Sequence, residues 1–420
     1  MSADASDGRG PAGGVRAAMG DAFGGALGAG LGPAFRDAFG LFISLRLVFG
    51  LVAIYVWWQG TLPGPCHFEL ARNGWATTPP LADQGAAFPL VGVWQRWDAC
   101  WYTKIATFGY EAGQNSVAFF PLFPLLVGLV GRLLLGAIAL GGLVVAGAAY
   151  VVAMTGLRRL VALDFDDDVS LRTVIAISIF PTAFFFFAPF TESLFLATTV
   201  WAILAARQRW WTIAAIAALL AALTRIQGVF LVLPLAWEAA MTWRDAGWGT
   251  GGRWWPPAGT RLRPIVAALA PAIGLAAFLM FSATVAGQTP LDTQEAWGGT
   301  NFHPPWEVID ASWRWAVQHH DPLQVFNLVA LIAFGLVTLV GLRQVPFAYS
   351  LFAIPQIALI ATRIQPIPLT STGRYLLVVF PVFVILALVE GRWVRFAWIV
   401  ASTMFLALLL ATFLQGSFVA

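Results

Sequence analysis

The chain has 420 residues, of which 59% are hydrophobic and only 11% are charged, whereas a typical soluble domain has about 25% charged residues. This composition excludes a soluble globular protein and predicts a polytopic membrane protein, because apolar runs recur along nearly the whole length. The net charge of +3 is small and the basic residues lie between the apolar runs, which argues against a nucleic-acid partner and for a role in membrane topology.

Residues 1–40 are rich in Gly, Ala and Asp and lack the continuous apolar core of a signal peptide. We expect them to form a mostly disordered cytoplasmic tail, with weak helix around Arg16 to Phe23. The remaining residues, 41–420, are expected to form a single transmembrane domain.

The first membrane span is expected at about Leu41 to Trp58, where an aromatic pair at its end is typical of a membrane interface. A long loop, residues 60–132, follows. Within it, residues 119–131 are apolar but short and contain two prolines, so we expect a re-entrant or interfacial helix.

Further apolar runs predict an all-α fold with about eleven transmembrane helices, in a range of ten to thirteen. After the first, these spans are expected at about residues 133–157, 171–187, 190–206, 211–223, 229–243, 264–286, 323–342, 346–361, 376–390 and 396–414. A second large loop, residues 287–322, separates two of them.

Arginines mark alternate loops, which we therefore expect to be cytoplasmic. They are Arg158, Arg159, Arg207, Arg209, Arg244, Arg253, Arg261, Arg263, Arg343, Arg392 and Arg395. The other loops, including 60–132 and 287–322, are then extracytoplasmic. The unusual polar residues described next all fall on this second side, although hundreds of positions separate them.

Asp98 lies in the sequence RWDACWYTKIATFGY, residues 96–110, beside a membrane-length segment. A carboxylate near hydrocarbon is costly and is therefore a candidate for function. The alternative is that Asp98 only caps a helix that begins near Ala99.

Glu192 lies between two apolar runs in FPTAFFFFAPFTESLF, residues 180–195, with no nearby cation in the sequence. Thr191 and Glu192 line a site, or they are the turn and N-cap of a helical hairpin. Arg225 and Gln227 interrupt the apolar ALTRIQGVF, residues 222–230. A binding role for Arg225 competes with that of an arginine that snorkels to the interface.

Arg374 and Tyr375 open a span in TSTGRYLLVVF, residues 370–380. The planar guanidinium is a bidentate donor suited to phosphate, and the alternative is an interfacial Arg–Tyr anchor. In the loop 287–322, Asn301 and His303 are candidates for contact with a sugar or a lipid headgroup, although an amphipathic interface helix would have a similar composition. The histidines show no metal-binding spacing.

The two cysteines, Cys66 and Cys100, form neither a CxxC motif nor a Cys/His metal pattern. Both lie in the expected extracytoplasmic loop, where a disulfide can persist. A disulfide and two free thiols both stay open, because the sequence does not give the separation of the two residues.

Five collinear segments resemble the PIG-V-like mannosyltransferases, the family of GPI mannosyltransferase 2, in its bacterial branch. They are RWDACWYTKIATFGY, AFFPLFPLL, FPTAFFFFAPFTESLF, ALTRIQG and STGRYLLVVFPVF, and the resemblance extends over about residues 41–388. It implies a GT-C-like membrane fold, a polyprenyl-phosphate-mannose donor, a first outer loop that carries the catalytic Asp, and chemistry on the extracytoplasmic face of a bacterial plasma membrane.

In an inverting transfer of this kind, we expect Asp98 to act as general base, and Arg225 and Arg374 to bind the donor phosphate. The other expected substrate-binding residues are Arg96, Trp97, Trp101, Tyr102, Thr191, Glu192, Gln227, Tyr375, Asn301 and His303. No metal or other cofactor is expected. The expected partners are the polyprenyl-phosphate sugar, membrane lipid and an acceptor that is a glycolipid, polysaccharide or protein, without nucleic acid.

Two other classes of protein stay open at this point. A secondary transporter or lipid-linked-sugar flippase would use Asp98, Glu192 and Arg225 as a relay. These residues favour one face of the membrane, however, whereas transporter sites lie near the midplane. A non-catalytic subunit of a glycosylation complex is the other alternative.

Overall fold

The computed structural model describes residues 11–60, 66, 88–113, 115–247, 258–296 and 301–419. Within these residues the protein is almost entirely helical, and the only strands are a two-residue antiparallel pair, β1 (Asn301–Phe302) and β2 (Arg363–Ile364). Six of the described helices are long and apolar enough to cross a membrane: Gly32–Gln59, Ile138–Val161, Ile226–Asp245, Arg261–Ala286, Pro322–Gly341 and Arg392–Leu414. The expected all-α polytopic membrane fold is confirmed, while the count of eleven spans stays a prediction.

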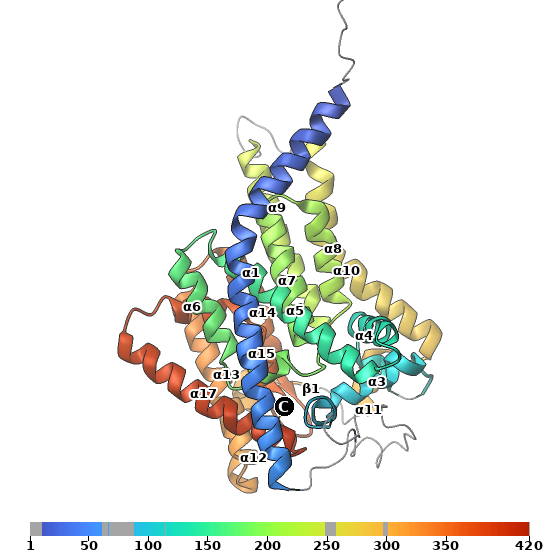
Figure 1. Ribbon diagram of the computed structural model, residues 1–420, viewed down its shortest axis with the longest axis vertical. Helices are drawn as coiled ribbons and strands as arrows, with labels where there is room; N and C mark the ends of the chain where they lie inside the picture. The colour runs from blue at the N-terminus through green and yellow to red at the C-terminus, as the bar shows by residue number, and fades with distance from the viewer. Residues whose placement is uncertain are drawn as a thin grey trace, which may run out of the picture.

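Helix α1 (Pro11–Gln59) runs along the outside of the molecule (Figure 1). It begins far before the expected first span, so residues 11–40 are described as helix, while the division of the chain into a cytoplasmic tail and a transmembrane domain stays a prediction. The segment contains many alanines, which favour helix, and Pro33 is accommodated inside the helix. Residues 1–10 of the expected tail lie outside the described residues, as do 61–65, 67–87 and 114 of the expected loop 60–132.

The central helices are α5 (Ile138–Val161) and α7 (Glu192–Arg207), which pack on each other and are buried along most of their length. Around them lie α4 (Leu122–Leu133), α8 (Trp211–Ala222), α9 (Val232–Asp245) and α10 (Ala258–Phe281). The short apolar segment expected at residues 119–131 is α4. It approaches α5 closely, because a Cβ on Gly141 would lie only 2.7 Å from the backbone of Gly131.

Two expected spans are interrupted. The span at 171–187 is α6 (Asp167–Ser178) followed by the 3-10 helix η4 (Ala183–Phe186), and the span at 376–390 is α15 (Thr372–Leu377) followed by α16 (Phe380–Ala387). Pro181 and Pro381 stand at the breaks, since proline cannot donate a backbone hydrogen bond and disfavours helix in the preceding residue. The breaks leave irregular buried backbone beside the candidate site.

The remaining helices complete the bundle and its loops. They are η2 (Gly92–Trp94), α3 (Asp98–Phe108), η3 (Ser116–Ala118), η5 (Ile226–Leu231), η6 (Ser282–Ala286), α11 (Pro290–Ala296), α12 (Pro305–His319), α13 (Pro322–Gly341), α14 (Phe347–Ala361) and α17 (Arg392–Leu414).

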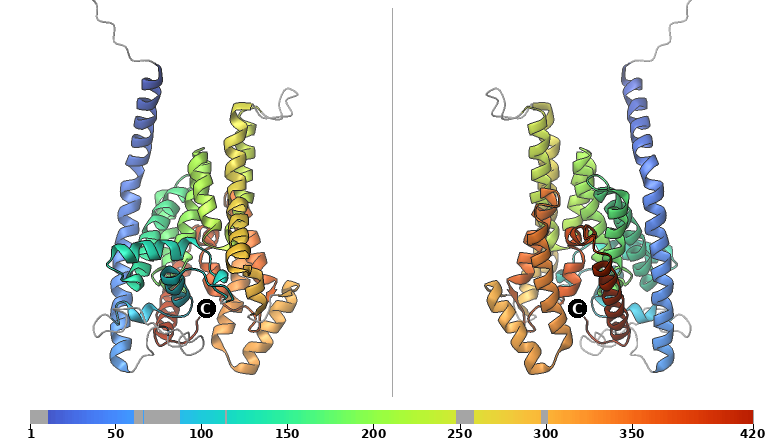
Figure 2. Two further views of the ribbon diagram at one scale, coloured as in Figure 1. Left: turned by 90° about the vertical axis from the view of Figure 1, so that its right-hand side faces the viewer. Right: turned by 90° about the vertical axis from the view of Figure 1, so that its left-hand side faces the viewer.

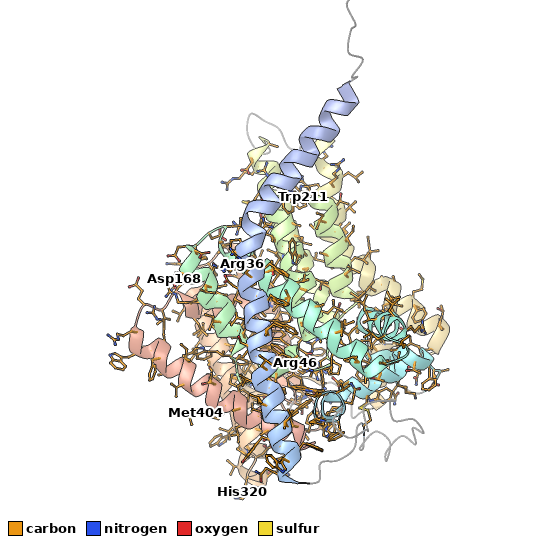
Figure 3. The ribbon with its side chains drawn as sticks, viewed as in Figure 1. Arg36, Arg46, Asp168, Trp211, His320 and Met404 are labelled. Carbon is orange, nitrogen blue, oxygen red and sulfur yellow. A yellow bond between two sulfur atoms is a disulfide. The ribbon has the colours of Figure 1, made fainter. Side chains whose placement is uncertain are left out.

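The two ends of the molecule carry different segments. Figure 2 shows the amino-terminal half of α1 and the joined ends of α9 and α10 projecting at one end, and α12 with the carboxyl end of α1 at the other. In Figure 3, Trp211 at the start of α8 lies towards the upper end and His320, which follows α12, lies at the lower end. This separation matches the two sets of loops that the arginines define in the sequence.

Cys66 and Cys100 form a disulfide, with their Cα atoms 5.7 Å apart. The separation lies in the ordinary range for such a bond. Because Cys100 belongs to the first turn of α3, the bond ties residue 66 of the outer loop to the helix that begins at Asp98.

Candidate active site

The carboxylate of Asp98 points to an arginine rather than to the helix end. Helix α3 begins at Asp98 without a side-chain cap, so the capping alternative does not describe this residue. Asp98 Oδ2 lies 2.6 Å from Arg374 Nη1. The preceding residue, Trp97, has φ +53°, a conformation that is strained for a bulky side chain.

Glu192, the first residue of α7, is fully buried and contacts both candidate arginines. Its Oε1 lies 2.7 Å from Arg374 Nε and 3.1 Å from Arg225 Nη1. Thr191 is also buried and makes no side-chain cap. Thr191 stands at the N-cap position of α7, as the hairpin-turn alternative expects, but its hydroxyl makes no capping hydrogen bond, and Glu192 contacts the two arginines.

Asp98, Glu192, Arg225 and Arg374 thus form one connected group, which we call the carboxylate–arginine cluster. They come from α3, α7, the residue before η5, and α15. The two carboxylates balance the two guanidinium groups. The side chain of Asp98 is 26% exposed, whereas those of the other three are at most 8% exposed, so Asp98 is the member that a substrate can reach most easily.

The contacts to Glu192 are charge pairs rather than aligned hydrogen bonds. Arg225 Nη1, Arg374 Nε and both carboxylate oxygens of Glu192 lack a hydrogen-bond partner of good geometry among the described residues. Most buried polar groups in folded proteins have a hydrogen-bond partner, so these atoms are exceptional. The cluster therefore retains donors and acceptors that a polar substrate could use.

Aromatic rings hold the two guanidinium groups from the sides. Arg374 lies over Phe185, Phe190 and Tyr375, at 5.2–5.6 Å from the ring centroids. Arg225 lies 5.1 Å from the Tyr375 ring and 5.9 Å from that of Phe195. Such cation–π contacts stabilise a desolvated cation. Both arginines are buried in the protein, so neither is a snorkelling or interfacial anchor.

The backbone beside Arg374 is fixed from two directions. The Gly373 N–H donates to Asn327 Oδ1 on α13 (3.1 Å), and the Thr182 hydroxyl donates to the Gly373 carbonyl (2.8 Å). A Cβ at Gly373 would lie 2.8 Å from the Phe326 ring, so glycine is the residue that fits here. Sequence reasoning missed Asn327 and Thr182, which look like ordinary polar residues inside apolar runs.

Two further predicted residues of α3 lie beside the cluster. Tyr102 is buried against Phe119 and Phe123, and Trp101 stacks on Phe119. Burial raises the pKa of the Tyr102 phenol, and the negative charge of Asp98 raises it further. Tyr102 is therefore a neutral phenol next to the carboxylate.

Arg96 and Trp97 meet the end of the chain. Arg96 donates to the carbonyl of Leu414 (3.4 Å), and the Trp97 ring meets Phe418 edge-on at 5.0 Å. These contacts hold the segment that precedes Asp98 against α17, so the structure supports a positioning role for both residues. Their direct contact with substrate stays a prediction.

The predicted residues of the second outer loop contact the segment around Arg363. Asn301 pairs with Ile364 across β1 and β2, and the His303 N–H donates to the Thr362 carbonyl (2.8 Å). The ring of His303 contacts Glu307. Among the described contacts, none joins Asn301 or His303 to the carboxylate–arginine cluster, and their effect is to hold the segment that contains Arg363.

Gln227 lines a small cavity of about 20 Å³ close to the cluster. Tyr375 lines the same cavity, and six of the nine lining residues are polar: Gln227, Arg363, Gln365, Thr370, Thr372 and Tyr375. We call it the Arg363 cavity. Sequence reasoning did not single out Arg363, Gln365 or Thr372, although they stand close to Arg374 in the same polar stretch.

The larger cavity lies elsewhere. An open pocket of about 590 Å³ lies between α4, α10 and the carboxyl half of α3, with mostly apolar walls that include Phe108, Leu125 and Phe281. Its nearest α3 residues are roughly 10–15 Å along the helix from Asp98. We do not assign the reaction to this pocket despite its volume, because the carboxylate–arginine cluster lies at the opposite end of α3, where the helix begins at Asp98. In the described part of the chain, no three His, Cys, Asp or Glu residues gather as a metal site would require.

A comparison with known protein families finds a similarity to a mannosyltransferase family. The family model described as mannosyltransferase (PIG-V) matches residues 42–246, just under half of the chain. The resemblance to PIG-V-like mannosyltransferases is thereby confirmed. The matched region contains Asp98, Glu192 and Arg225, while Arg374 lies beyond it.

The comparison with solved structures gives a more distant similarity. Three structures of an oligosaccharyltransferase from Archaeoglobus fulgidus align with 76–90% of this chain at 14–15% identity and TM-scores of 0.37–0.42. One of them contains an inhibitory peptide and a dolichol-phosphate. The chain spans about half the length of these relatives, 48–56%. No curated protein matches the chain in sequence.

Proposed function

We propose that the protein transfers a mannosyl residue from a polyprenyl-phosphate-mannose donor to a hydroxyl of an extracytoplasmic acceptor, with inversion at the anomeric carbon. The observation that supports this most is the carboxylate–arginine cluster. It combines one accessible carboxylate, Asp98, with two buried guanidinium groups inside a membrane glycosyltransferase.

In this reaction the acceptor oxygen forms a bond to C1 of mannose as the bond from C1 to the phosphate oxygen breaks. Asp98 takes the acceptor proton, and the departing polyprenyl phosphate keeps the bonding electrons. Arg374 and Arg225 stabilise the charge that develops on the phosphate. Because Arg374 contacts Asp98, a phosphate that attracts Arg374 would also release Asp98 for its role as base.

Glu192 keeps the two guanidinium groups together, and its unpaired oxygen can accept a hydrogen bond from a sugar hydroxyl. The location that fits this chemistry is the extracytoplasmic face of a bacterial plasma membrane. Acceptors of the glycolipid, polysaccharide and protein classes all present a suitable hydroxyl.

The test uses membranes from cells that express the full chain, supplied in parallel with radiolabelled polyprenyl-phosphate mannose, polyprenyl-phosphate glucose and a nucleotide-linked mannose. We expect label in an acceptor fraction from the first donor only. Movement of intact donor between leaflets without labelled product would instead identify a flippase. Transfer from the nucleotide sugar alone would reject a lipid-borne donor.

A further inference from the structure

The carboxylate–arginine cluster is electrically neutral as a whole. Asp98 and Glu192 contribute two negative charges, and Arg225 and Arg374 contribute two positive charges, all within contact distance. A donor phosphate would approach a locally neutral group. Recognition of the phosphate therefore needs a further cation close to Arg225 and Arg374.

The Arg363 cavity meets this need. Tyr375 borders both the cavity and the cluster, because it lines the cavity and its ring lies 5.1 Å from Arg225 and 5.6 Å from Arg374. Among the described residues that line the cavity, Arg363 is the one that carries a charge, and amides and hydroxyls supply most of the remaining wall.

A second observation indicates that the cavity takes a ligand. The Thr372 side chain is fully buried, lines the cavity, and its hydroxyl has no hydrogen-bond partner among the described residues. Leaving a buried hydroxyl without a partner costs free energy. A volume of about 20 Å³ admits one oxygen-sized group, which matches a single phosphoryl oxygen inserted between Thr372 and Arg363.

The position of Arg363 is fixed by the second outer loop. Phe302 of β1 pairs with Arg363 of β2, and the His303 N–H donates to the carbonyl of the preceding Thr362. The second outer loop therefore has a structural role. It holds an arginine beside the cavity, and the described contacts of Asn301 and His303 serve this segment.

We infer that Arg363, with Thr372, Gln227 and Gln365, forms an anion-binding site for a phosphate ester, distinct from the carboxylate–arginine cluster, with Tyr375 bordering both. The inference rests on the proposed function. The phosphate belongs either to the polyprenyl donor or to a phosphorylated acceptor headgroup, and both present the same oxygens to Arg363. A guanidinium suits this task because its planar fork can donate two hydrogen bonds to one phosphate.

The test measures binding to the purified full chain in lipid nanodiscs, using polyprenyl phosphate and the polyprenol of the same length. We expect the wild type to bind the phosphate more tightly than the alcohol. Arg363→Gln should weaken polyprenyl-phosphate binding about tenfold or more and leave polyprenol binding unchanged, as expected for one lost charge-assisted hydrogen bond. Thr372→Val should give a smaller loss, about fivefold, because a neutral hydroxyl contributes less.

A matched control is Arg314→Gln. Arg314 is an exposed arginine on α12, in the same outer loop, where it pairs with Asp310, and its loss should leave both affinities unchanged. Arg363→Lys keeps the charge but loses the fork, so its affinity for the phosphate should fall between those of wild type and Arg363→Gln. If Arg363→Gln does not fold, Arg363→Lys provides the binding comparison with the wild type.

A second arm replaces the lipids with glycerol 3-phosphate and glycerol. Loss of only polyprenyl-phosphate binding in Arg363→Gln assigns the site to the donor, and loss of only glycerol 3-phosphate binding assigns it to a phosphorylated acceptor. Unchanged binding of both phosphates in folded Arg363→Gln and Arg363→Lys overturns the inference. If wild type still transfers mannose in that case, the proposed function stands without this site.

Discussion

The two ends of α7 carry ionic groups of different character. At its first residue lies the carboxylate–arginine cluster, buried among aromatic rings. At its last residue, Arg207 contacts Asp164 and lies 4.0 Å from Glu238, in a group whose members are all partly exposed. The two ends are about 22 Å apart along the helix.

The difference in burial suggests different roles for the two groups: the Arg207 group anchors loops, and the carboxylate–arginine cluster serves the reaction. The group around Arg207, the last residue of α7, includes Asp164, which follows α5, and Glu238 in the middle of α9. Partial exposure keeps its desolvation cost low. The carboxylate–arginine cluster brings together residues from four distant segments and removes most of them from solvent, which is expensive. Retaining such a group beside a strained Trp97 is easier to explain by chemistry than by stability.

The largest expected difference between the two ends is accessibility. Gln318, close to His320 at the lower end in Figure 3, and Asp168, at the start of α6, are both exposed. In intact cells, a membrane-impermeant thiol reagent should label Gln318→Cys and spare Asp168→Cys, because the arginine-bearing loops are expected inside. The native cysteines do not interfere, since they form a disulfide. The reverse labelling pattern would invert the proposed topology.

Removal of the shared carboxylate should be the most destabilising change within the cluster. In Glu192→Leu, Arg225 and Arg374 lose the partner between them and stay buried, which typically costs about 3–5 kcal/mol. Denaturant unfolding of the purified protein measures the loss in the free energy of unfolding. A change below about 1 kcal/mol would show that the arginines find other partners.

A smaller expected effect concerns the backbone that carries Arg374. Gly373→Ala places a methyl group against Phe326 and should cost about 1–3 kcal/mol of stability, with a lower transfer rate because Arg374 is displaced. The control is Gly335→Ala on α13, where nothing lies within 4 Å of the new methyl. That substitution should be neutral or slightly stabilising in a helix. Equal effects of the two substitutions would remove Gly373 from the account.

The smallest effect is expected for an exposed pair beside the Arg207 group. Arg209 contacts Asp245 at 2.6 Å, and both side chains are more than half exposed. Asp245→Asn should change the free energy of unfolding by at most about 1 kcal/mol and leave transfer unchanged. A large loss of transfer would mean that this end of the molecule takes part in the reaction.

Much of the site could be predicted from the sequence, residue by residue. Asp98, Glu192, Arg225 and Arg374 are each conspicuous because a charge in an apolar run is costly, and the arginine pattern places them on one face. Their pairing could not be predicted, since contacts among residues up to 276 positions apart depend on the tertiary fold. The same holds for the disulfide, which requires a Cα separation that a sequence does not contain.

Other features were missed for identifiable reasons. Hydrophobic runs predict continuous spans at 171–187 and 376–390, but the prolines at 181 and 381 end the helices early. The Ala-rich tail was expected to be disordered because it lacks a core pattern, yet α1 begins at Pro11. Arg363 was overlooked because an arginine near a span end resembles an ordinary interfacial residue, and only the cavity around it marks it as different.

The central claim is that Asp98 takes the acceptor proton. The most direct test compares wild type with Asp98→Asn, measuring mannose transfer per folded molecule and, separately, binding of polyprenyl-phosphate mannose. Asparagine keeps the size of the side chain but cannot take the proton at neutral pH. We expect donor binding to persist while transfer falls by a factor of about 10²–10⁴. Transfer near the wild-type rate by folded Asp98→Asn would contradict the central claim.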